Sequence, residues 1–180
     1  MKYVVLLRGI NVGGRNKVPM ASLKKRLEEL GFTNVSTYIA SGNVILESDK
    51  SNDEIRVQLE EALPGSFKLD DELIKVLVLT RNQLQAVIDN KPEGFGEHLG
   101  QYHSDAIFLM GIDSDRAMSL FNPREGVDTV WPGDGVIYSQ RLSSQRTKSR
   151  LSKIMATPAY KSMTIRSWST TTKLLEILKK

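Results

Sequence analysis

Apolar residues along the first 80 positions follow spacings that predict four strands and two helices. The run Lys2–Leu7 is apolar on both faces, which is typical of a central strand. After Pro19, positions 20, 23, 27 and 30 form one apolar helical stripe, and Gly31 ends it. The remaining patterns predict strands at 34–39, 44–47 and 73–79 and a capped helix from Ser51 to Pro64-Gly65.

The resulting order, β-α-β-β-α-β, is that of a ferredoxin-like unit, and the same order recurs in the second half of the chain. Thr80 and Gln83 have capping-box spacing and predict a linking helix, which a glycine-rich loop over 90–103 follows. In the second half we predict strands at 106–110, 127–131, 136–139 and 163–166 and helices at 113–121, 148–155 and 171–178. The helix at 148–155 should turn Leu151, Ile154 and Met155 inward.

These elements predict an α+β fold built from a duplicated ferredoxin-like unit. A lone ferredoxin-like sheet buries only one face well, whereas both predicted central strands are apolar on both faces, so we expect the two halves to cover each other. The chain should therefore form a single compact unit over 1–180, with halves at 1–80 and 104–180 joined by a linking helix and loop at 81–103.

The composition argues against several classes of site. The chain has 180 residues, 40% of them hydrophobic, with no cysteine and two histidines. We therefore expect no disulfide, no metal site and no cofactor, and a reducing compartment as the setting. No signal peptide precedes the first strand, and no apolar run approaches the roughly 20 residues that span a membrane. These observations predict a cytoplasmic protein without a membrane partner.

The net charge of +4 hides a block pattern. Residues 1–27 carry seven cations and no acid, residues 28–140 carry eight cations and twenty acids, and residues 141–180 carry ten cations and one acid. One interpretation is that the blocks neutralise each other across the fold or form solvated faces. The other is that both basic ends line one groove for a phosphate-bearing ligand.

The segment from Arg8 to Lys17 is the strongest candidate for a binding site. It contains three glycines, two asparagines and three cations, and no acid. Glycine lets the backbone approach a ligand closely, and the helix that follows offers unpaired N–H groups and a positive dipole end. The candidate residues here are Arg8, Gly9, Asn11, Gly13, Gly14, Asn16 and Lys17. The competing interpretation is a tight strand-to-helix turn whose polar groups satisfy its own backbone.

Two further regions can contribute to this site. In the ferredoxin-like sheet order 4-1-3-2, the end of strand 1 and the hairpin between strands 2 and 3 share one edge, so Ser41 and Asn43 should lie beside Arg8. Lys153 and Arg166, from the basic C-terminal block, can add positive charge. The glycine spacing fits neither a dinucleotide fingerprint nor a P-loop, and Ser41 lacks the surroundings of a nucleophile.

Other notable residues are expected to be structural. His98 and His103 should be exposed in the glycine-rich loop. The acidic run 70–72 could bind a cation, but acids before a strand are usually solvated, and we expect the same here. Trp168 should anchor the closing helix, with Ser169 or Thr170 as its cap.

A series of short motifs resembles one known family. Its N-terminal part comprises Leu7–Gly14, Asn16–Met20, Leu30–Phe32, Thr37–Ile39 and Ser41–Val44. Its C-terminal part comprises Thr147–Ser149, Leu151, Lys153, Thr164, Arg166, Trp168, Thr170 and Lys173–Leu174. On these residues the whole chain resembles the bacterial domain-of-unknown-function family numbered 1697. The resemblance implies a duplicated ferredoxin-like fold in a cytoplasmic bacterial protein and implies no known activity. Ser167 stands where the family pattern has asparagine.

Three functions remain open on the sequence. The first is binding of a phosphate-bearing small molecule or nucleic acid at the Arg8–Lys17 loop. The second is an enzyme acting on a phosphorylated or carboxylated metabolite, for which Lys17 or Lys153 would have to act as the base. The third is a structural or interaction module without a ligand. The substrate and the oligomeric state are not readable from the residues.

Overall fold

Strand β1 (Lys2–Leu7) forms the centre of the first sheet in the computed structural model, which describes residues 1–180. It pairs antiparallel with β3 (Asn43–Glu47) on one edge and with β4 (Val76–Thr80) on the other. Adding β2 (Thr33–Tyr38) gives the order β2-β3-β1-β4, which is the predicted ferredoxin-like order. Residues 3–7 are buried, as expected for a strand with neighbours on both edges.

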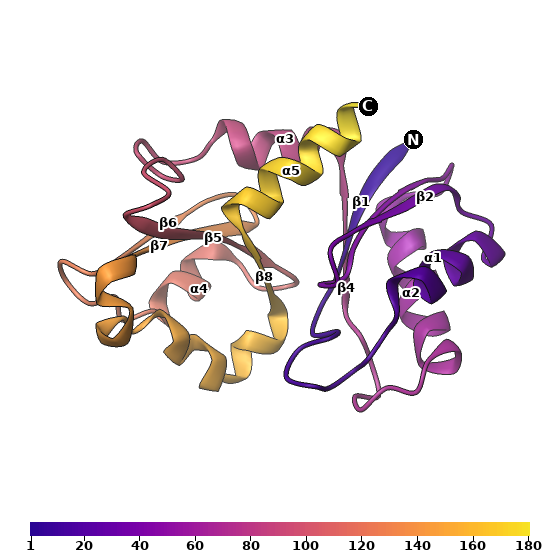
Figure 1. Ribbon diagram of the computed structural model, residues 1–180, viewed down its shortest axis with the longest axis horizontal. Coiled ribbons are helices and arrows are strands. Elements are labelled where there is room, and N and C mark those ends of the chain that lie inside the picture. The colour runs from indigo at the N-terminus through magenta and orange to yellow at the C-terminus, as the bar shows by residue number, and fades with distance from the viewer. The chain divides into compact units, whose positions relative to one another are not determined.

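Helices α1 (Met20–Glu29) and α2 (Asn52–Ser66) cover one face of this sheet (Figure 1). Their buried leucines and isoleucine pack against alternate residues of β1, which gives one apolar core. The capping box at Ser51 and Glu54 that starts α2 is present, as predicted. The helix runs past the expected stop at Pro64, because the Phe67 N–H still reaches the Leu63 carbonyl at 3.2 Å and closes the last turn.

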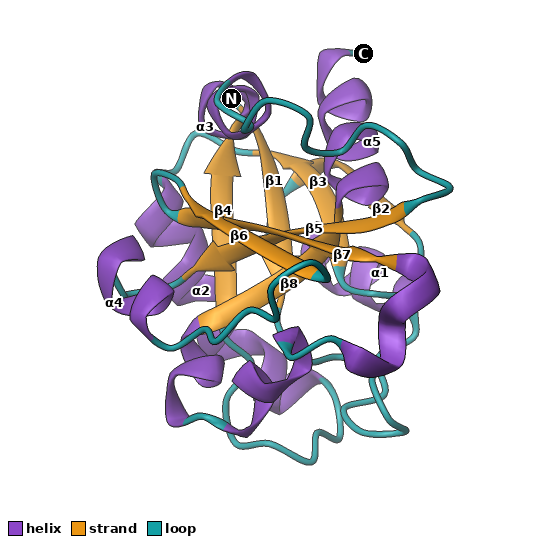
Figure 2. Ribbon diagram, turned by 90° about the vertical axis from the view of Figure 1, so that its left-hand side faces the viewer, coloured by secondary structure: helices purple, strands orange, loops and turns teal.

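The second sheet repeats the order of the first. Its strands β5 (Tyr102–Leu109), β6 (Asp128–Pro132), β7 (Val136–Leu142) and β8 (Met163–Ser167) stand in the order β6-β7-β5-β8. Figure 2 shows the strands of both sheets in orange. The short helix α4 (Ser114–Ser119) follows β5 and is capped by Asp113, which accepts the Arg116 N–H at 2.8 Å. The predicted mixed α+β fold is therefore confirmed.

The predicted helix at 148–155 does not form. Three 3₁₀ helices replace it, η1 (Ser143–Lys148), η2 (Leu151–Ala156) and η3 (Pro158–Ser162). Leu151 and Ile154 are buried as predicted, but Met155 is 56% exposed. A 3₁₀ helix has three residues per turn, so positions 151 and 154 share one face and position 155 turns away from it.

Two more helices complete the chain. The linking helix α3 (Arg81–Asp89) carries the predicted capping box, in which the Thr80 N–H donates to Gln83 Oε1 at 2.8 Å and the Gln83 N–H donates to Thr80 Oγ1 at 3.1 Å. The closing helix α5 (Trp168–Lys179) begins three residues earlier than predicted. Its cap is Ser167, whose Oγ accepts the Thr170 N–H at 3.2 Å, and not Ser169 or Thr170.

The chain divides into two units. The first comprises residues 1–85 together with 174–180, and the second comprises residues 86–173. None of the helices has the length and apolar character needed to cross a bilayer.

An aromatic cluster supports the second unit. The Phe95 ring makes edge-to-face contacts with Trp131, Tyr138 and Trp168, at centroid distances of 5.7, 5.2 and 5.0 Å. The next residue, Gly96, has φ +74°, and a Cβ placed on it would lie 2.3 Å from Trp168 Cδ1. The Trp168 anchor predicted from the sequence therefore depends on the absence of a side chain at position 96.

We predict that Gly96→Ala destabilises the protein more than Gly94→Ala. Both glycines have positive φ, at +74° and +77°, but a Cβ on Gly94 meets nothing within 4 Å. The control substitution should cost about 1–2 kcal/mol for backbone strain alone, and Gly96→Ala should cost a further ~1–3 kcal/mol from the clash. Thermal denaturation of both variants measures the difference. Equal melting temperatures would show that the Trp168 contact is not restrictive.

Candidate functional site

The Arg8–Lys17 loop begins where β1 leaves the sheet, with neighbours on both sides. The Leu7 N–H donates to the Gly42 carbonyl and the Arg8 N–H donates to the Lys75 carbonyl, both at 2.9 Å. The hairpin after β2 and the segment before β4 therefore flank the start of the loop. Because these contacts are to backbone atoms, the position of the loop start is set by sheet geometry.

The side chain of Asn11 forms its hydrogen bonds within the protein. Its Nδ2 donates to the carbonyls of Val18 and Ala40, both at 2.8 Å, and its Oδ1 accepts the Val18 N–H at 2.8 Å. These three bonds tie the loop to the approach of α1 and to the hairpin. Asn11 also adopts φ +54°, a conformation that asparagine tolerates better than most residues. Its function in the structure is to hold the loop closed.

Asn16 is a second internal clamp and is 1% exposed. Its Nδ2 donates to the Gly9 carbonyl at 3.0 Å and to Asp71 Oδ2 at 2.6 Å. Its Oδ1 accepts the N–H groups of Asp70 and Asp71 at 2.9 and 3.1 Å, and its own N–H donates to Asp70 Oδ2 at 2.6 Å. The amides of Asn11 and Asn16 therefore build the loop, as the strand-to-helix turn interpretation expects.

The tip of the loop is exposed and small. Val12 and Arg15 pair across it, with the Arg15 N–H donating to the Val12 carbonyl at 3.0 Å. Gly13 and Gly14 occupy the turn with φ +59° and +76°, and a Cβ on either would meet nothing within 4 Å. These two glycines are needed for turn conformation, and the open space around them leaves their backbone accessible to a ligand.

The acid-free loop finds its counterions in the acidic run at 70–72. Arg15 Nη2 lies 2.9 Å from Asp71 Oδ1. The hydrogen bond from Asn16, the bond from Arg15 and the charge of Arg8 hold the pKa of Asp71 below its ordinary value. The acidic run is exposed, as predicted, but Asp70 and Asp71 are also partners of the loop, a role that the sequence reasoning missed. The run precedes β4, which pairs with β1, and this adjacency was the available signal.

Lys17 and the start of α1 are the parts of the loop that the fold leaves open. Lys17 is exposed and forms no hydrogen bond or ion pair. Pro19 occupies the N-cap of α1, offers no side-chain cap and has no acid after it in the first turn. The first N–H groups of α1 therefore lack both an intrahelical partner and a capping side chain.

The hairpin residues lie beside the loop but differ in access. Asn43 is fully buried, pairs in register with Leu6, and donates from Nδ2 to the Tyr38 carbonyl at 3.1 Å. A ligand at the surface cannot reach it. Ser41 is exposed at the hairpin tip, and a Cβ on the next residue, Gly42, would lie 2.9 Å from Ile10 Cγ1. The close approach of hairpin and loop therefore requires glycine at position 42.

Lys153 and Arg166 belong to the second unit, and their sharing of one site with the loop stays a prediction. Lys153 is exposed on η2. Arg166 is buried on β8, where its Nη1 donates to Thr164 Oγ1 at 2.9 Å and to the Ile165 carbonyl at 2.8 Å. Desolvation lowers the pKa of Arg166 to about 10.

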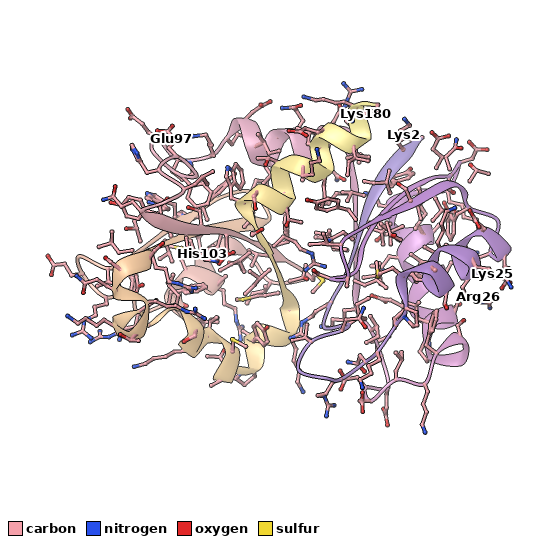
Figure 3. All side chains as sticks on the ribbon, in the orientation of Figure 1. Lys2, Lys25, Arg26, Glu97, His103 and Lys180 are labelled. Atoms are coloured by element: carbon pink, nitrogen blue, oxygen red, sulfur yellow. The ribbon has the colours of Figure 1, made fainter.

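The second unit holds a polar cluster that sequence reasoning missed. His103, which Figure 3 labels, is exposed as predicted. It lies on β5 and not in a loop, and its Nε2 is 3.1 Å from Asp105 Oδ2. Burial raises the pKa of Asp105, against the lowering effects of His103 and Arg141. Arg141 pairs in register with both His103 and Asp128. The i, i+2 spacing of His103 and Asp105 on a strand was the signal that the loop assignment hid.

Residues 1–138 match a protein family of unknown function, DUF1697. The chain belongs to this family. Among solved structures it is similar to a conserved bacterial protein from Streptococcus pneumoniae, with 27% identity, a TM-score of 0.80 and 98% of each chain covered. No curated protein matches the sequence. The resemblance read from the motifs is thus confirmed at the level of family and fold.

We predict that Asn16→Ala destabilises this DUF1697 protein by about 2–4 kcal/mol, because it leaves buried backbone donors and a carbonyl without partners. Urea denaturation measures the change. Asn122→Ala is the matched control, because the Asn122 side chain is exposed and makes no hydrogen bond within the protein. Its free energy of unfolding should stay within about 0.5 kcal/mol of that of the parent protein. Similar effects of the two substitutions would contradict the clamp.

The same substitution should alter the pH dependence of stability. Because the folded pKa of Asp71 is lowered, its ionised form adds stability above the unfolded pKa, and that contribution disappears as the pH falls through the folded pKa. Without Asn16, the largest cause of the shift is gone, so the pKa of Asp71 should rise toward its ordinary value. The stability gap between the parent protein and Asn16→Ala should therefore narrow as the pH falls below about 4. A gap that widens in acid would contradict this assignment.

Proposed function

We propose that this protein binds a phosphate-bearing small molecule at the Arg8–Lys17 loop. The main support for the proposal is that different residues of the loop have different roles. Asn11 and Asn16 lock its backbone from inside, while Gly13, Gly14, Arg15 and Lys17 remain exposed at its surface. A preorganised loop loses little conformational freedom when it binds a ligand.

The exposed groups match the chemistry of a phosphate. Backbone N–H groups at the glycine turn, the uncapped first turn of α1 and the ammonium group of Lys17 are all donors, and anions are favoured at helix N-termini. Arg15 retains further guanidinium donors beyond the one engaged with Asp71 Oδ1. The loop therefore supplies positive charge together with directional donors.

The small number of cations in the loop favours a small molecule over nucleic acid. The loop carries three cations, and Asp70 and Asp71 lie beside them. Proteins that bind duplex DNA commonly neutralise about 6–10 phosphates. Three cations, partly neutralised by two carboxylates, are too few for such a row of phosphates, so the loop suits one phosphate group of a small molecule.

Binding also fits the site better than catalysis does. The two lysines on which an enzymatic mechanism would depend, Lys17 and Lys153, are exposed to solvent. A catalytic lysine is ordinarily activated by desolvation or by a cation held close to it. Neither lysine shows the enclosure that such activation requires.

We predict that Lys17→Ala weakens binding of adenosine diphosphate, used as the probe, by about 10-fold or more, because one charge-assisted hydrogen bond is lost. Arg8→Ala should also weaken binding. Calorimetric titration at fixed ionic strength measures the affinities, and melting curves show whether each variant is folded.

Lys24→Ala is the control, since Lys24 lies on the exposed side of α1 and pairs only with Glu28, at 3.3 Å. It should leave the affinity unchanged. If Lys24→Ala and Lys17→Ala lose equal affinity for adenosine diphosphate, the loop is not the binding site. A parallel titration with a ten-residue oligothymidylate tests the nucleic-acid interpretation, which a tight and steeply salt-dependent interaction would restore.

A further inference from the structure

A cavity of about 350 Å³ lies at the opposite end of β1 from the Arg8–Lys17 loop. Its walls come from three parts of the first unit, namely Met1 and Lys2, the start of α3 at Thr80–Asn82, and the end of α5 at Leu178–Lys179. Figures 1 and 2 both show the N-terminus, α3 and the C-terminal end of α5 at this end of the molecule. The volume lies within the range of small-molecule sites, about 300–1,000 Å³.

The walls of the cavity carry three cationic side chains and no acid. Lys2, Arg81 and Lys179 are all lining residues. The side chains of Arg81 and Lys179 are exposed and form no hydrogen bond or ion pair. Lys2 has one counterion outside the cavity, Glu47, at 3.9 Å.

The backbone around the cavity is fixed in place. The capping box joins Thr80 to Gln83, and Gln83 Oε1 also accepts from Asn52 Nδ2 at 2.9 Å. The first N–H groups of a helix have no intrahelical partner. In α3 the capping box provides a partner for the N–H of Gln83 but not for those of Arg81 and Asn82. On the other wall Leu178 is 1% exposed, which anchors the end of α5. The cations therefore stand on a rigid frame with an apolar side.

Like charges around one cavity repel each other, and a bound anion removes that repulsion. A single negative charge would leave most of this repulsion, a dianion removes more of it, and a trianion matches the three cationic side chains in charge. The planar fork of Arg81 suits a phosphate or carboxylate group, and the lysines act as point charges.

We propose that this cavity binds a compact small molecule with two or more phosphate or carboxylate groups. It is distinct from the loop site, because the six residues of β1 separate the two by about 20 Å. Neither proposal depends on the other.

Amide chemical shifts during titration with pyrophosphate, and separately with citrate, test the proposal on the full chain. We expect saturable shifts at Lys2, at Thr80–Asn82 and at Leu178–Lys179 with at least one of the two probes. The preferred probe distinguishes a phosphate ligand from a carboxylate ligand. Shifts confined to the Arg8–Lys17 loop, or no saturable shift with either probe up to ~10 mM, would overturn the proposal.

Calorimetry on variants gives the second arm of the test. Lys179→Glu changes an exposed side chain, so folding should be unaffected, and binding of the preferred probe should weaken by about 10-fold or more. Arg81→Gln should have a similar effect. The control Lys25→Gln removes one exposed cation from α1, labelled in Figure 3, and should change the affinity less than about twofold. Equal affinities for Lys179→Glu and Lys25→Gln would refute the site.

Discussion

The hydrogen bonding of β1 along both edges is the constraint on which the first unit depends. Because β3 and β4 occupy both edges and residues 3–7 are buried, this strand offers a ligand only its two ends. One end continues into the Arg8–Lys17 loop, and the other opens into the basic cavity. The sheet thus places two positively charged regions at the two ends of β1, and only its end residues, such as Lys2, take part in them.

The loop shows how structural and binding interpretations of one motif can both hold. Its asparagines serve the fold, since nearly every polar atom of Asn11 and Asn16 has a partner within the protein. Its acids come from a distant segment, and Asp71 balances Arg15 across 56 residues of sequence. The side chains of Asn11 and Asn16 hold the loop in place, and the part that stays exposed is a short cationic turn. A rigid turn loses less conformational freedom on binding a ligand than a flexible one does.

Strand order, the capping boxes of α2 and α3 and both apolar cores could be predicted from the sequence, because period-2 and period-3.6 patterns and capping pairs such as Thr80 and Gln83 are local signals. The 3₁₀ segment could not, since Leu151 and Ile154 fit either helix type and only the exposure of Met155 separates them. The roles of Asp70 and His103 were missed for another reason. Asp70 reaches Asn16 because β4 pairs with β1, and that pairing is not visible in local spacing. The partner of His103 is Asp105 on the same strand, and the loop predicted over 90–103 hid their i, i+2 spacing.

A crystal structure of the protein soaked with adenosine diphosphate tests the central claim most directly. We expect a phosphate group within hydrogen-bonding distance of the Gly13 and Gly14 N–H groups and of Lys17, with the hydrogen bonds of Asn11 and Asn16 unchanged. A diphosphate bound elsewhere while the loop stays empty at saturating ligand would contradict it. So would a loop that rearranges to release the Asn16 side chain when the ligand binds.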